Sequence, residues 1–149
     1  APASSPQEAL ASLFSGFAAG SYISLQAFLP YQREIEEGLT EIASFLGEKT
    51  RCAVTVGFGP RFLHSTGQLH KGDAGRGIFV QFLNENSLHL PIPGENFDFA
   101  FLKKAQALGD REALRNRGRR VLTFLITGSV PEALARIREL FGNLPLWRR

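Results

Sequence analysis

Apolar residues follow two different periods along this chain. Four short runs are almost continuously apolar, as buried parallel strands are, and they cover about residues 22–29, 51–56, 78–83 and 121–126. Between these runs, apolar residues recur every three or four positions, which is typical of amphipathic helices. The helical segments cover about residues 6–20, 31–47, 98–108 and 129–141, with shorter helices expected at 65–71 and 111–116. Strands that alternate with helices predict an α/β fold, a three-layer parallel sheet with helices on both faces.

Capping and breaking residues set the expected helix ends. Ser5 and Ser129 precede helical segments that carry proline in their first turn, so both are expected to be N-caps. Gly109 and Asp110 are expected to break the helical pattern between residues 98 and 116. The apolar tail at residues 141–147 is expected to dock on the core or on a further lobe.

Composition indicates one soluble globular domain. The chain has 149 residues, of which 44% are hydrophobic and 21% charged. No apolar run approaches the roughly 20 residues of a membrane-spanning helix, so no membrane partner is expected. A single cysteine, Cys52, excludes an internal disulfide and fits the cytoplasm; it is expected to be a buried apolar residue. The chain contains no methionine, which indicates a processed product or a piece of a longer protein.

The basic excess is small, with a net charge of +3. Five arginines gather at residues 111–120 and could hold phosphate or nucleic acid, although a solvated basic helix face is the simpler interpretation. A nucleic-acid-binding domain would bind in a strongly salt-dependent way. Because the cluster lacks interleaved aromatic residues, no nucleic-acid partner is expected.

The richest chemistry lies between the second and third predicted strands, in residues 58–72. Ligands of open α/β sheets bind beyond the carboxyl ends of the strands, where this turn would lie. Its imidazoles can exchange protons near neutral pH, and its amides and hydroxyls can hold oxyanions or hydroxyl groups. The set suits a polyhydroxylated or phosphorylated small molecule, although His64 could instead only cap or brace the turn. Its candidate residues are Arg61, His64, Ser65, Thr66, Gln68, His70 and Lys71.

Several other site types are not indicated. The sequence lacks a phosphate loop that ends in Lys-Ser or Lys-Thr, and it lacks a Gly-x-Ser-x-Gly elbow. Gly57-Phe-Gly59 follows a strand, but Phe62 stands where a dinucleotide fingerprint has its third glycine. The three histidines show no convincing metal-ligand spacing. A phosphate loop, a dinucleotide site and a metal site are therefore not expected.

A resemblance extends this interpretation. The segment Leu63-His-Ser-Thr-Gly-Gln68 resembles the Leu-His-Ser-x-Gly-Gln segment of bacterial glucose-6-phosphate isomerases. The longer stretch at residues 57–72 is similar to the isomerase portion of bifunctional transaldolase/glucose-6-phosphate isomerase proteins. Weaker similarity to that group lies at residues 22–30, 90–110 and 118–121, so the resemblance covers about residues 20–127.

The resemblance implies a sugar-isomerase (SIS) fold with a flavodoxin-like parallel sheet. It also implies reversible interconversion of glucose 6-phosphate and fructose 6-phosphate without metal or organic cofactor. His64 matches the family's histidine, which opens the sugar ring. Glu48 is the nearest candidate for the glutamate that moves a proton between C1 and C2, and Lys103, or Lys104 beside it, is a candidate for the assisting lysine. Asp73 stands where the bifunctional group usually has glycine, so the loop there is expected to differ.

The resemblance also implies partners. The family's phosphate is held mainly by an upstream lobe, so this chain is expected to be a C-terminal lobe that is inactive, or nearly so, without it. The parent protein is expected to include a transaldolase domain, and the lobe could form a homodimer. The alternative is a non-catalytic sugar-phosphate-binding or assembly module with the same fold.

Overall fold

The computed structural model describes residues 3–145 and confirms the expected alternation of helices and strands. Every strand and main helix that the apolar patterns predict is present, although several of the boundaries differ. In chain order they are α1 (Pro6–Phe14), β1 (Tyr22–Phe28), α2 (Arg33–Thr50), β2 (Val54–Phe58), the 3₁₀ helix η1 (Arg61–His64), α3 (Thr66–Gly72), β3 (Gly77–Asn84), α4 (Phe99–Asn116), β4 (Arg120–Ile126) and α5 (Val130–Gly142).

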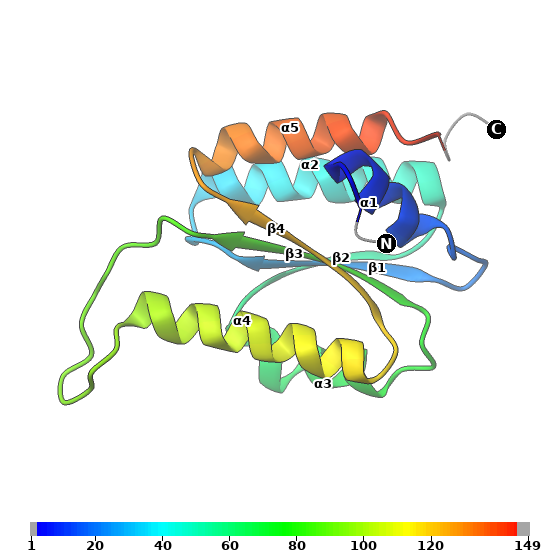
Figure 1. Ribbon diagram of the computed structural model, residues 1–149. Coiled ribbons are helices and arrows are strands. Elements are labelled where there is room, and N and C mark those ends of the chain that lie inside the picture. Colours follow the sequence, from blue (N-terminus) through cyan, green and yellow to red (C-terminus); the bar gives the residue numbers. More distant parts are fainter. Residues whose placement is uncertain (1–2, 146–149) are drawn as a thin grey trace.

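The four strands form one parallel sheet in the order β2-β1-β3-β4. Leu25 of β1 lies between Val56 of β2 and Val80 of β3, and Val80 in turn neighbours Leu122 of β4. Helices α1, α2 and α5 cover one face of the sheet, and α3 and α4 cover the other (Figure 1). The predicted three-layer α/β fold is therefore confirmed, and the strand order equals the first four strands of the flavodoxin-like order.

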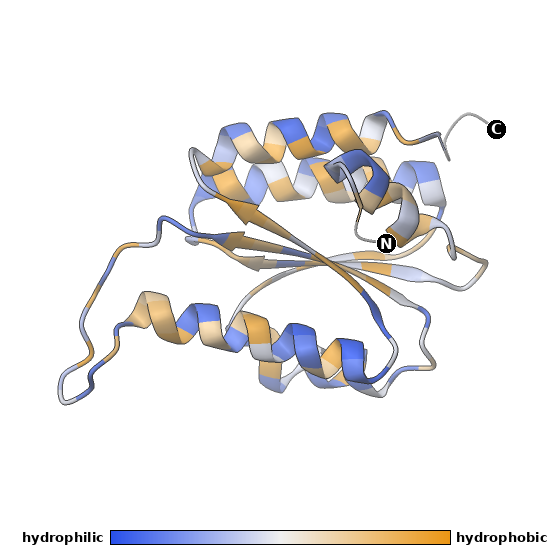
Figure 2. Ribbon diagram, in the orientation of Figure 1, coloured by the Kyte–Doolittle hydropathy of each residue, from blue (hydrophilic) through white to orange (hydrophobic). Residues whose placement is uncertain are grey.

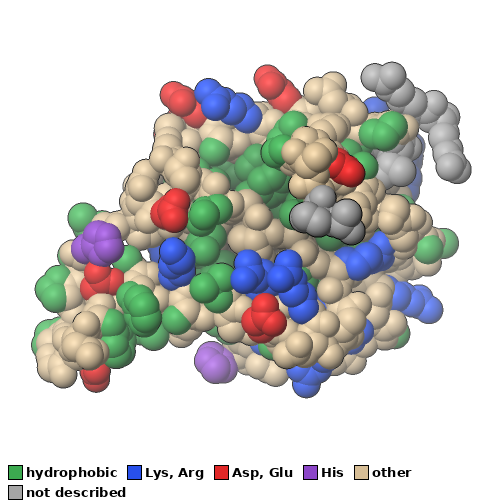
Figure 3. Space-filling model, viewed as in Figure 1, with side chains coloured by type: hydrophobic (Ala, Val, Ile, Leu, Met, Phe, Trp, Pro, Cys, Tyr) green, Lys and Arg blue, Asp and Glu red, His purple; other side chains and the backbone are tan. Residues whose placement is uncertain are grey.

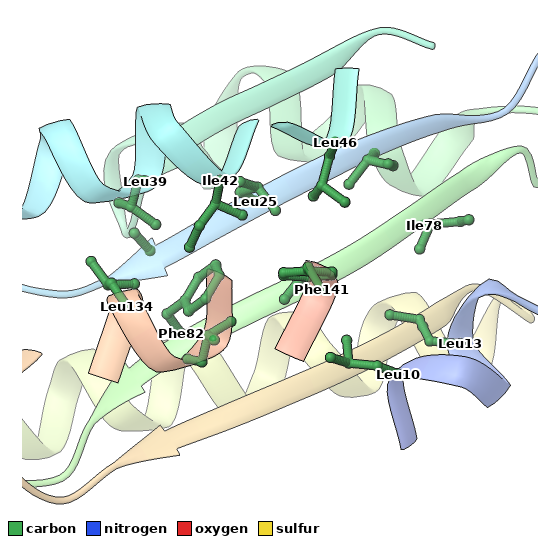
Figure 4. Close-up of a cluster of buried hydrophobic side chains, with 14 of the residues drawn as sticks. Leu10, Leu13, Leu25, Leu39, Ile42, Leu46, Ile78, Phe82, Leu134 and Phe141 are labelled. Carbon is green, nitrogen blue, oxygen red and sulfur yellow. The ribbon is translucent and has the colours of Figure 1, made fainter. Parts of the chain in front are cut away.

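The main core lies between the sheet and α1, α2 and α5. Apolar side chains of α2 and α5, Leu39, Ile42 and Phe141 among them, meet Leu25 and Phe82 of the strands (Figure 4). Helices α2 and α5 turn their apolar residues toward the sheet and their polar residues toward solvent (Figure 2). The expected tail at residues 141–147 begins inside this core, whereas its end at residues 146–147 lies outside the described part of the chain.

Two of the predicted helix starts are confirmed. The Ser5 hydroxyl accepts a hydrogen bond from the backbone N–H of Glu8, and that of Ser129 accepts one from Glu132. The first helix ends earlier than expected, at Phe14. Across residues 3–145, none of the helices is long and apolar enough to span a membrane.

The predicted break in α4 is wrong. Helix α4 runs without interruption through Gly109 and Asp110, so the two expected helices are one. Gly109 is exposed, and an exposed glycine costs a helix only about 1 kcal/mol. Asp110 is almost fully buried against the sheet, where its carboxylate contacts Gln81 and Lys71. These tertiary contacts outweigh the local preference for a break.

Candidate functional site

The turn after β2 is held by a small apolar cluster of its own. Phe62 and Leu63 of η1 pack with Phe28 and Leu83, which lie at the carboxyl ends of β1 and β3. Ala107 of α4 closes the cluster from below the sheet. This packing fixes η1 at the carboxyl edge of the sheet, the edge where the sequence predicts ligand binding.

Arg61 and His64 stand together on the outer side of η1. Because side chains three residues apart eclipse each other in a 3₁₀ helix, both project from the same side of the turn. Both are exposed. The Arg61 guanidinium lies 4.8 Å from the ring centre of Tyr31, which fixes its direction. The His64 side chain makes no hydrogen bond or ion pair with any residue from 3 to 145.

Gln68 braces the turn in place of His64. Its amide nitrogen donates to the carbonyl of Leu63 at 3.0 Å. The Ser65 hydroxyl also bonds inside the turn, to the carbonyl of Phe62 at 3.3 Å, and it occupies the N-cap of α3 without making a capping bond. Thr66 is exposed beside it. The polar groups of Gln68 and Ser65 therefore support the turn and leave the imidazole of His64 open to a ligand.

Lys103 of α4 lies on the same side as the turn. It is one helical turn before Ala107, which belongs to the same apolar cluster as Leu63. Lys103 is half-buried, and this burial lowers the pKa of its ammonium. It forms no ion pair within the described part of the chain. Such a half-buried cation without a counter-charge can accept an anionic ligand.

Glu48 is not brought to His64. It is exposed near the end of α2, which leads from the carboxyl end of β1 back to the start of β2. Glu48 therefore lies at the amino edge of the sheet, and α2 packs with α5 on the opposite face from α3. Within one chain, the candidate glutamate Glu48 and the candidate histidine His64 therefore do not lie together.

His70 and Lys71 are also turned away from the exposed turn. The Lys71 ammonium lies 2.7 Å from Asp110 Oδ1, an ion pair without hydrogen-bond geometry. His70 is 7% exposed and faces Gln26 under the sheet. The predicted binding residues are thus divided between an exposed set around His64 and a buried set at the end of α3.

The buried set belongs to a line of polar side chains across the sheet. The Thr123 hydroxyl donates to Gln81 Oε1 at 3.1 Å, and Gln81 Nε2 donates to Gln26 Oε1 at 3.1 Å. Gln26 Nε2 lies 3.5 Å from His70 Nδ1. We call these four side chains, Thr123, Gln81, Gln26 and His70, the polar relay. Polar residues inside the apolar strand patterns were the sequence signal for the relay, which sequence reasoning missed.

Asp73 organises the loop between α3 and β3. Its carboxylate accepts hydrogen bonds from the Tyr22 hydroxyl at 2.8 Å and from the backbone N–H groups of Gly75 and Gly77. Arg119 Nε lies 2.9 Å from the same carboxylate. Burial alone would raise the pKa of Asp73, but the hydrogen bonds and the arginine together lower it. The Asp73 side chain thus ties the loop to β1, to the start of β3 and to Arg119.

The expected arginine cluster does not form one surface. Arg119 is largely buried and donates to the backbone carbonyls of Lys71 and Asp73. Arg120 reaches the carbonyl of Leu13 on the other face of the sheet. Arg119 and Arg120 therefore stabilise the fold, which reduces the basic charge available to a polyanion.

A separate cavity opens at the end of β3. Its volume is about 570 Å³, and Glu85, His89 and Lys104 are among its lining residues. Asp98 caps α4 by accepting the backbone N–H of Phe101 at 2.7 Å, and it also pairs with His89. The apolar pattern predicts a helix at residues 98–108, and no site is assigned to His89 from the sequence. Among residues 3–145, no group of His, Cys, Asp and Glu is arranged to hold a metal ion.

The loop after β3 and the first turn of α4 form a projecting arm, residues 85–101 (Figure 1). Hydrophobic side chains gather on this end of the molecule (Figure 3). More than half the surface of each of four large side chains is exposed there: Leu88, Leu90, Phe99 and Phe101. An apolar surface of this kind is typical of a site of protein contact.

Comparisons with known proteins give a fold without a function. No family model matches the sequence, and no curated protein matches it. A solved structure, described as a hypothetical protein from Thermus thermophilus, is similar with a TM-score of 0.72 at 16% sequence identity. The match covers 96% of this chain and 38% of that protein. This chain therefore has the fold of one part of a longer α/β protein.

Proposed function

We propose that this chain is one lobe of an aldose–ketose isomerase that interconverts glucose 6-phosphate and fructose 6-phosphate. The observation that carries the proposal is the placement of Arg61 and His64 on the same side of a firmly packed turn at the carboxyl edge of the sheet. The surrounding segment is also the one that resembles the isomerases most closely, at residues 57–72.

The chemistry of ring opening fits these side chains. A proton must leave the C1 hydroxyl and another must reach the ring oxygen, and imidazole exchanges protons near neutral pH. His64 would perform this transfer, and the fork of Arg61 would add hydrogen bonds to the phosphate group, which the upstream lobe would mainly hold. Lys103 offers a second cation, which would stabilise the negative oxygen of the enediolate. No step requires a metal or an organic cofactor.

The base that moves a proton between C1 and C2 would come from outside this lobe. Glu48 lies at the other edge of the sheet, so the carboxylate is proposed to belong to an upstream isomerase lobe or to a second copy of the chain. The exposed apolar arm at residues 85–101 offers a surface for such a partner. The isolated chain would then be inactive or nearly so, and its parent would include the upstream lobe and a transaldolase domain.

The displaced Glu48 also favours a second candidate function. A lobe that holds Arg61 and His64 without a carboxylate beside them could bind a sugar phosphate, or assemble with another protein, without catalysing the reaction. Under this alternative, substitution of His64 changes ligand affinity or assembly and leaves turnover in the parent protein unchanged.

The test uses the parent protein, or this chain mixed with the upstream lobe. Conversion of fructose 6-phosphate is followed by coupling to glucose-6-phosphate dehydrogenase. We expect His64→Asn to lower kcat by roughly 10²–10⁴-fold while the urea unfolding curve is unchanged, because the side chain is exposed. Glu41→Gln, at an exposed position of α2 on the other face of the sheet, is the control and should leave kcat unchanged. Full turnover by His64→Asn would overturn the catalytic role, and robust turnover by the isolated chain would overturn the need for a second lobe.

A further inference from the structure

The polar relay has a fixed direction. Gln81 Nε2 lies 3.5 Å from Asp110 Oδ2 as well as 3.1 Å from Gln26 Oε1. A carboxylate can only accept, so the amide nitrogen of Gln81 must face Asp110, and its oxygen must accept from Thr123. The oxygen of Gln26 then accepts from Gln81, and its nitrogen is turned toward His70.

This direction determines the tautomer of His70. Because Gln26 presents an N–H group to Nδ1, Nδ1 is the acceptor and the ring proton resides on Nε2. Burial lowers the pKa of the imidazole, more than Asp110 and Asp73 raise it, so the ring is neutral. Nε2 has no partner among residues 3–145. His70 therefore holds a neutral N–H donor that the protein itself does not use.

A small pocket lies beside this donor, between β1, β2 and α3. Its volume is about 270 Å³, and His70 and Ser24 form part of its wall. Ser24 is only 2% exposed, but its hydroxyl, which bonds to no group of residues 3–145, is open to the pocket and not sealed in the core. Phe62 and Leu69 contribute apolar surface. None of the described residues that line the pocket is a lysine, arginine, aspartate or glutamate.

We propose that this pocket binds a small, uncharged, planar molecule whose carbonyl oxygen accepts hydrogen bonds from His70 Nε2 and the Ser24 hydroxyl. A carbonyl oxygen inside the pocket could accept hydrogen bonds from this hydroxyl and from the imidazole N–H together. A phosphate or carboxylate would enter without a counter-charge, so sugar phosphates are excluded from this pocket. The volume, just below the usual range for ligand pockets, suits a molecule of about one ring. The site is separate from His64 and does not depend on the isomerase proposal.

Benzamide and benzoate are the matched probes, since they have the same size and differ in charge. Titrations would be followed by the backbone amide signals of residues 55–57 and 66–70. We expect saturable benzamide binding with Kd on the order of 1 mM, and benzoate binding at least about tenfold weaker. Equal affinity for the two probes, or no saturable shift at these positions, would overturn the proposal.

Ser24→Ala separates binding from folding. We expect it to weaken benzamide binding about tenfold, the loss of one hydrogen bond, while Tm is unchanged or higher, because no protein group bonds to the hydroxyl. Ser44→Ala, at an exposed serine of α2, is the control and should bind benzamide like the unsubstituted chain. Unchanged affinity in Ser24→Ala, or nitrogen chemical shifts that place the His70 proton on Nδ1, would refute the site. His64→Asn should leave benzamide binding unaffected.

Discussion

The ammonium of Lys71 lies 2.7 Å from a carboxylate oxygen of Asp110, and this ion pair ties α3 to α4 beneath the sheet. The Asp110 side chain is 2% exposed and that of Lys71 is 14% exposed. The other oxygen of Asp110 faces Gln81. One carboxylate therefore neutralises a buried cation and also orients the polar relay.

Removal of one charge from this pair should destabilise the fold strongly. Lys71→Met leaves the Asp110 carboxylate buried without its counter-charge, and we expect the free energy of unfolding to fall by about 3 kcal/mol. The double substitution Lys71→Met, Asp110→Asn should recover much of that loss, because no buried charge remains. Urea unfolding of the two single variants and the double variant measures the coupling. A cost under about 1 kcal/mol for Lys71→Met would show that the pair contributes little.

His70 should make the fold sensitive to mild acid. Burial lowers the pKa of His70, although Asp110 and Asp73 oppose the effect and Lys71 adds to it. The unfolded chain then takes up the proton first as the pH falls, so this stability is complete above about pH 6.5 and is lost as the pH falls below it. Urea unfolding between pH 7.5 and pH 5 should show the decline. In His70→Gln the part of the decline that is due to His70 should vanish, and an unchanged slope would contradict the assignment.

Two glycines of α3 offer a matched test of the turn. A Cβ at Gly67 would lie 2.9 Å from the backbone carbonyl of Phe62, so Gly67→Ala must push η1 away from α3. We expect a loss of about 1–3 kcal/mol in unfolding free energy and weaker binding of fructose 6-phosphate, because η1 carries His64. Gly72→Ala places its methyl group in open space and should be neutral or slightly stabilising. Equal stabilities of the two variants would show that the contact is easily relieved.

Neighbouring lysines of α4 test the proposed anion site. Lys103 is half-buried, so Lys103→Met removes a desolvated charge and should leave the unfolding free energy unchanged or raise it by less than about 1 kcal/mol. If Lys103 faces the ligand, the same variant should bind fructose 6-phosphate more weakly, whereas substitution of the exposed Lys104 by methionine should not. Calorimetric titration of the parent protein compares them. Similar affinities of both variants would remove Lys103 from the site.

The strands were predictable because continuous apolar runs such as 121–126 have few other interpretations. The continuity of α4 through residues 109 and 110 was not predictable. Gly109 favours a helix break, and the contact of Asp110 with Gln81 that opposes the break exists only in the folded structure. The position of Arg61 and His64 at the carboxyl edge followed from their place after a strand. The separation of Glu48 from His64 could not be predicted, because Glu48 was chosen from the resemblance of residues 47–50 to a family motif, and only the order of helices and strands in space places it at the other edge of the sheet.

The direction of the polar relay has a consequence for divergence. Asp110 fixes the orientation of Gln81, which fixes that of Gln26. Replacement of one of these side chains by an apolar one would therefore leave its neighbours without hydrogen-bond partners. Distant relatives should therefore either keep all of these polar side chains or have apolar side chains at all of these positions. Relatives that keep only some of the polar side chains should be rare.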